Sequence, residues 1–203
     1  MRVNGDAADF SRRDNKLIIK PSKVLDGRFS ATIRYHGKPV THIDPDGSED
    51  GWKPTAGGGA TVLSEPVGAM TWFPNNNTPR DKATFDMRIT VPSKFEVAGG
   101  GDLRSVRKHD GKETWRWQQP CQQATYLAMI SIANYDVYHS TTKALQRTRR
   151  GCGPQPMAGR ATPSSSRPNT TVTQRWTHYG RQHRQRLMIL QIYSGRRDTC
   201  EAT

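Results

Sequence analysis

The chain has 203 residues, of which 33% are hydrophobic. A compact domain usually has nearly half, so part of this chain is expected to contribute little to a core. No apolar run approaches the roughly 20 residues needed to cross a bilayer, and Met1–Phe10 lacks an apolar leader segment. We therefore expect no membrane segment and no signal peptide, with a cytoplasmic location by default.

The net charge of +13 is concentrated at the carboxyl end. Residues 145–203 contain 11 arginines, no lysine and two acidic residues, which gives 11 − 2 = +9, whereas residues 1–144 contribute 20 − 16 = +4. The stretch from Gln146 to Thr173 is rich in Gly, Pro, Ser and Thr and has no hydrophobic period. This composition predicts a disordered, Arg-rich tail over 145–203. Its lysine-free character also supports the hypothesis that the tail is an out-of-frame translation.

Residues 1–144 show the period-two alternation of half-buried strands. In the run Lys82–Val91 every second residue is apolar, and Arg28–Tyr35 repeats the pattern. The nearly continuous apolar run Tyr126–Ile132 predicts a strand covered on both faces. Shorter strands are expected at Lys16–Ile19, Ala69–Phe73 and Thr114–Trp117. Turn clusters rich in Gly, Asn and Pro separate these runs, so the fold class predicted for residues 1–144 is all-β and antiparallel, without a helix.

The stretch from Glu65 to Pro92 carries a family resemblance. It reads EPVGAMTWFP, then TPRDKATFD from Thr78, then ITVP from Ile89. This pattern resembles the amino-terminal domain of the zinc aminopeptidases typified by aminopeptidase N, and Thr114–Trp117 and Ala124–Ala128 look like that family's next strands. The resemblance covers residues 1–144. It implies an incomplete, saddle-like β-sandwich domain that the chain enters and leaves part-way, as a fragment.

Glu65 is the one candidate site residue. By its position before the W-F-P motif, it resembles the Gln or Glu with which this family holds the free amino group of a peptide substrate. The resemblance therefore implies a substrate-binding role for Glu65. Without the resemblance, an isolated glutamate in a loop would be interpreted as a solvated side chain.

A zinc peptidase site requires H-E-x-x-H, in which two histidines on one helix face bind the metal and the glutamate activates water. None of the six histidines is followed by Glu, and no two are spaced for this motif. We therefore expect no catalytic residue, no metal ligand and no cofactor in this chain, although the resembled enzymes use zinc. Cys121, Cys152 and Cys200 form no C-x-x-C pair and are expected to be free thiols.

The predicted function is that of a non-catalytic fragment of a zinc aminopeptidase. It would bind a peptide amino terminus only when completed by a catalytic domain. Two other functions remain open. The Arg-rich tail could bind nucleic-acid phosphates without sequence preference, or the β domain could be an interaction module without a peptidase role.

Overall fold

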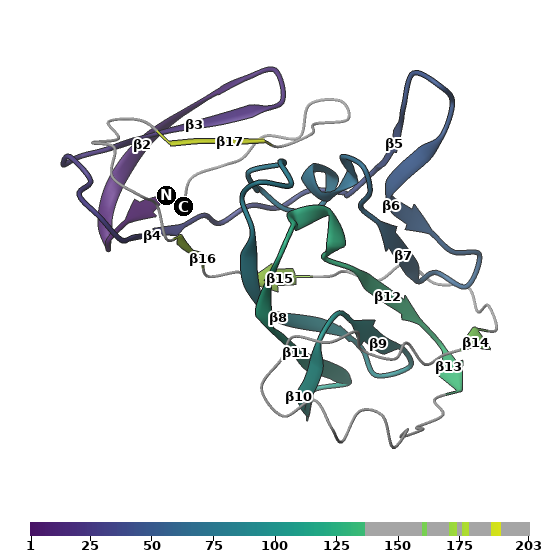
Figure 1. Cartoon of the computed structure of the whole chain (residues 1–203). Coiled ribbons are helices and arrows are strands. Elements are labelled where there is room, and N and C mark those ends of the chain that lie inside the picture. The colour runs from purple at the N-terminus through teal and green to yellow at the C-terminus, as the bar shows by residue number, and fades with distance from the viewer. Residues whose placement is uncertain (137–159, 162–170, 174–175, 179–187, 192–203) are drawn as a thin grey trace, which may run out of the picture.

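A computed structural model describes residues 1–136 and four later segments, 160–161, 171–173, 176–178 and 188–191. The described chain is built from antiparallel strands and two short 3-10 helices (Figure 1). This confirms the predicted all-β fold class. Among the described residues, no helix has the length and apolar character that crossing a membrane requires.

Four amino-terminal strands and two strands of the tail form one six-stranded sheet beside a small core. Its order is β16-β4-β1-β2-β3-β17, with all neighbours antiparallel. The strands are β1 (Arg2–Val3), β2 (Asp6–Arg13), β3 (Lys16–Pro21), β4 (Phe29–Thr32), β16 (Trp176–His178) and β17 (Met188–Gln191). Leu17 and Ile19 of β3 are buried in its core, and β3 contains the strand predicted at Lys16–Ile19.

Two further sheets enclose the main core. One has the order β5-β6-β7-β12-β9 and the other β10-β11-β8-β15. The first consists of β5 (Thr41–Ile43), β6 (Glu49–Pro54), β7 (Ala60–Leu63), β12 (Ile130–Ala133) and β9 (Glu96–Gly99). The second consists of β10 (Asp102–His109), β11 (Lys112–Gln123), β8 (Ala83–Pro92) and β15 (Thr171–Thr173). A two-stranded pair joins β13 (Tyr135–Asp136) to β14 (Arg160–Ala161).

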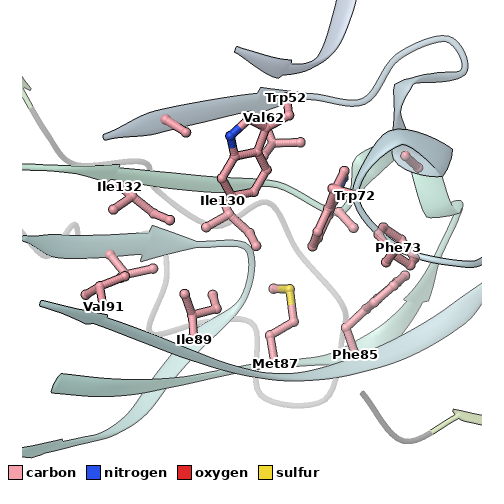
Figure 2. Packing of buried hydrophobic residues seen from close by; sticks show 14 of the residues in the cluster. Trp52, Val62, Trp72, Phe73, Phe85, Met87, Ile89, Val91, Ile130 and Ile132 are labelled. Carbon is pink, nitrogen blue, oxygen red and sulfur yellow. The ribbon is translucent and has the colours of Figure 1, made fainter. Parts of the chain in front are cut away.

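The alternating strand β8 supplies one wall of the main core. Phe85, Met87, Ile89 and Val91 are buried on one face, whereas the intervening side chains are partly or fully exposed. Figure 2 shows these side chains pointing toward Ile130 and Ile132 of the other sheet and toward Trp72. The period-two prediction for this strand is therefore confirmed.

Three predicted strands differ from the structure in extent or type. The strand predicted over Arg28–Tyr35 ends at Thr32, and the following Tyr35 packs against both hydrophobic cores. Ala69–Phe73 lies largely in a buried 3-10 helix, η1 (Gly68–Thr71), and Tyr126–Ile132 begins in a second one, η2 (Thr125–Leu127). A short apolar run does not distinguish a strand from a short helix, because neither leaves a clear period over so few residues. Leu127 of η2 is 49% exposed, so the expectation that Tyr126–Ile132 is covered on both faces is wrong for this residue.

Three of the four described tail segments lie along the edges of larger sheets, and β14 forms a separate two-stranded sheet with β13. β15 pairs with β8, β16 with β4, β17 with β3 and β14 with β13. Edge strands offer unpaired N–H and C=O groups, which accept such additions. Most of the tail predicted to be disordered lies outside the described residues, so the boundary at residue 144 stays a prediction.

Cys121 lies near the end of β11, where the register with β8 shifts between Gln119 and Gln123. It is disulfide-bonded, so the prediction of three free thiols is wrong for this residue. Cys152 and Cys200 lie outside the described residues.

Truncating the core at Ile130 is expected to destabilise the domain strongly. Ile130 is fully buried, and Ile130→Ala should lower the free energy of unfolding by about 2–5 kcal/mol through lost burial and the cavity left behind. Ile43 is 65% exposed, so Ile43→Ala should change it by less than about 0.5 kcal/mol. Urea unfolding measures both, and equal effects would contradict the described core.

Candidate functional site

Glu65 lies two residues after the end of β7, in the loop that leads into η1. Its side chain is exposed, and it is joined to Pro66 by a cis peptide bond. Within residues 1–136, no hydrogen bond or ion pair engages its carboxylate. The structure therefore presents Glu65 as an accessible negative charge.

The loop that follows Glu65 is held by the buried carboxylate of Asp50, on β6. One carboxylate oxygen, Oδ2, accepts hydrogen bonds from the backbone N–H groups of Val67 at 3.0 Å and Gly68 at 2.8 Å. Asp50 is only 2% exposed, and hydrogen bonds to an ionised acceptor are the stronger kind. This contact fixes the backbone two and three residues beyond Glu65.

Two glycines let the loop approach β6 closely. A Cβ atom placed on Gly68 would lie 2.2 Å from the Gly51 nitrogen and 2.6 Å from the Gly51 Cα. Gly51 itself has φ +85°, a left-handed conformation that favours glycine. A larger residue at either position would push η1 away from the strand that holds it.

The other side of the loop is fixed by side-chain hydrogen bonds. The Ser64 hydroxyl donates to the Ala128 carbonyl at 3.1 Å and accepts a hydrogen bond from the Trp72 indole N–H at 3.2 Å. The Asn77 amide donates to the Val67 carbonyl at 2.7 Å. Together with Asp50, these contacts hold the chain on both sides of Glu65.

The aromatic residues of the W-F-P motif support the loop from inside. Trp72 and Phe73 are buried and pack edge to face, with ring centroids 4.3 Å apart. Phe73 in turn packs edge to face on Phe85 of β8. The Tyr35 hydroxyl donates to the Trp72 carbonyl at 3.1 Å, and burial raises the pKa of Tyr35 well above its ordinary value. The motif thus forms core rather than a binding surface (Figure 2).

Among the described residues, one group of side chains could hold a metal ion: His42, Asp44 and Asp50. Zinc in the H-E-x-x-H arrangement needs two histidines, and this group has one, so it does not fit the catalytic zinc of the resembled family. Sequence analysis missed Asp50 and its group. The alternation of Asp44, Asp46, Ser48 and Asp50 in the printed sequence was the available signal.

The arrangement is an all-β sandwich with a rigid loop that exposes one carboxylate. The Peptidase M1 N-terminal domain family model matches residues 9–127, and the chain belongs to this family. A search of curated proteins gave no match.

Most of the Arg-rich tail lies outside the described residues, so nucleic-acid binding through it stays a prediction.

Solved structures of M1 zinc metallopeptidases share the fold. One, from Deinococcus radiodurans, has a TM-score of 0.53 and 22% identity over 69% of this chain. A mutant of a two-domain M1 enzyme bound to L-arginine has a TM-score of 0.54 and 23% identity over 69% of this chain. A mutant bound to L-tryptophan has a TM-score of 0.52 and 24% identity, also over 69% of this chain. The chain covers 32% of the first structure and 33% of each of the other two, about a third of their length.

Removing the Asp50 carboxylate is expected to release the Glu65 loop. Asp50→Ala leaves the N–H groups of Val67 and Gly68 without an acceptor, and each unsatisfied buried donor costs about 1–3 kcal/mol. The free energy of unfolding should fall accordingly in urea titrations. The matched control is Glu49→Ala, because Glu49 is exposed and forms a surface ion pair with Lys53. A loss no larger than in the control would show that Asp50 does not hold the loop.

Proposed function

We propose that this chain is the non-catalytic, substrate-anchoring part of a zinc aminopeptidase, and that Glu65 binds the free amino group of the peptide. The observation that carries the proposal is the exposed carboxylate of Glu65 on a loop held by Asp50. Family membership supports the same role, because Glu65 opens the stretch EPVGAMTWFP that resembles the family's W-F-P region.

The chemistry of the pair explains why such a residue selects amino termini. An ammonium group donates charge-assisted hydrogen bonds to a carboxylate, whereas an internal amide carries no charge to offset carboxylate desolvation. A loop fixed in advance also loses little conformational entropy when the ligand binds. Glu65 would therefore favour a free amino terminus over an internal or blocked one.

Peptide hydrolysis would require groups that this sequence does not supply in H-E-x-x-H form. The chain spans about a third of the M1 structures that it resembles. The rest of such an enzyme would supply the residues that bind zinc and activate water. Two of those structures are complexes with free amino acids, L-arginine and L-tryptophan. These ligands carry the amino group that we assign to Glu65.

The chain alone is expected to have no peptidase activity. Purified protein supplied with zinc should release no arylamine from aminoacyl-arylamide substrates, because it lacks the H-E-x-x-H residues that would bind zinc and activate water. Release is followed by absorbance, with and without a chelator. Chelator-sensitive turnover by the pure chain would contradict the proposal.

Anchoring by Glu65 is tested separately by an NMR titration with a short peptide amide, in which the full chain is first completed by the catalytic domain of an M1 enzyme. Backbone resonances around residues 63–68 should shift with the free peptide and not with its N-acetylated form. Glu65→Ala should abolish the shifts, whereas Glu49→Ala, which removes another exposed glutamate, should preserve them. Equal responses to free and acetylated peptide would reject the anchoring role.

A further inference from the structure

The hairpin formed by β5 and β6 brings three metal-binding side chains together. His42 of β5 lies opposite Asp50 of β6 in the register, and Asp44 follows directly after β5. The loop closes through hydrogen bonds from the Asp44 N–H to the Ser48 carbonyl at 2.8 Å and from the Gly47 N–H to the Asp44 carbonyl at 2.9 Å. The backbone thus sets these positions before any ligand arrives.

The distances within this group are close to those of a metal centre. Nδ1 of His42 lies 3.0 Å from Oδ1 of Asp50 and 3.7 Å from Oδ1 of Asp44. Ligands at about 2.0–2.2 Å from one zinc ion lie roughly 3–3.5 Å apart. One ligand atom from each residue falls within 4.8 Å of the others, so small side-chain rotations would complete the geometry.

The two carboxylates of the group face the His42 imidazole. The chain has 31 Lys and Arg residues, yet within the described part neither Asp44 nor Asp50 forms a salt bridge with one of them. Lys53, which follows Asp50 on the same strand, pairs with Glu49. The side chains of His42, Asp44 and Asp50 are only 15%, 16% and 3% exposed, so solvent screens the two carboxylates poorly.

Asp50 also has the support that metal ligands usually have. Its Oδ2 atom is occupied by the backbone N–H groups of Val67 and Gly68, which leaves Oδ1 directed at His42. Hydrogen bonds to the second carboxylate oxygen hold a ligand in orientation and are a common feature of metal sites.

We propose that His42, Asp44 and Asp50 bind a divalent transition-metal ion through Nδ1 of the imidazole and one oxygen of each carboxylate. A mixed nitrogen and oxygen set suits Zn²⁺ or Mn²⁺ better than Ca²⁺, which prefers oxygen ligands alone. The site would stabilise the hairpin and, through Asp50, the Glu65 loop. It does not depend on the role proposed for Glu65.

Calorimetric titration of the full chain with Zn²⁺ tests the site. The wild type should bind one ion with saturation, and His42→Ala and Asp44→Asn should each weaken binding at least about tenfold. Asp44→Asn leaves the contacts of Asp50 with Val67 and Gly68 in place, so its thermal unfolding without metal should match the wild type. His109→Gln is the control, because His109 is exposed on another hairpin and also lies beside an aspartate.

Co²⁺ provides a second measurement of the same site. Cobalt bound by imidazole and carboxylates should give d–d absorption without a thiolate charge-transfer band, and the d–d absorption should disappear in Asp44→Asn. Three results would overturn the proposal: no saturable Zn²⁺ binding by the wild type, binding that His42→Ala and Asp44→Asn leave unchanged, or a thiolate band that identifies cysteine as the ligand.

Discussion

The buried carboxylate of Asp50 is the contact on which the candidate site depends. It joins β6 to the loop after Glu65 by two backbone hydrogen bonds, and its other oxygen faces His42. A charge this deeply buried is tolerated only when its hydrogen-bonding capacity is satisfied. Gly51 and Gly68 approach closely where the loop packs on β6. The β5–β6 hairpin and the Glu65 loop are therefore held together through Asp50.

The main core gives this unit a rigid base. Trp72 and Phe73 extend from the loop into the space between the two sheets that enclose the main core, where they pack with Phe85 and Met87 of β8 (Figure 2). Tyr35 packs against this core and against that of the amino-terminal sheet. The apolar residues thus position the loop that carries the exposed side chain of Glu65.

Most of the correct predictions came from the alternation of apolar residues and from the W-F-P motif. The alternation of apolar and polar residues in β8 identified its buried face, because Phe85, Met87, Ile89 and Val91 all point to the same side of a strand. The W-F-P motif singled out Glu65 as a candidate residue. The helix η1 was wrongly predicted as a strand, because a short apolar run that is buried on all sides shows neither the period of a helix nor that of a strand. Asp50 was missed because an acid beside an acidic turn is normally solvated. Its burial arises from the tertiary approach of a loop 17 residues away.

Amide hydrogen exchange at Val67 and Gly68 tests most directly whether the Glu65 loop is fixed by Asp50. In the wild type these two amides should exchange slowly, at rates close to those of the core strand β8. In Asp50→Ala they should exchange fast while the β8 amides stay protected, because only the local clamp is removed. Rapid exchange of both amides in the wild type, or unchanged protection in the variant, would contradict the account.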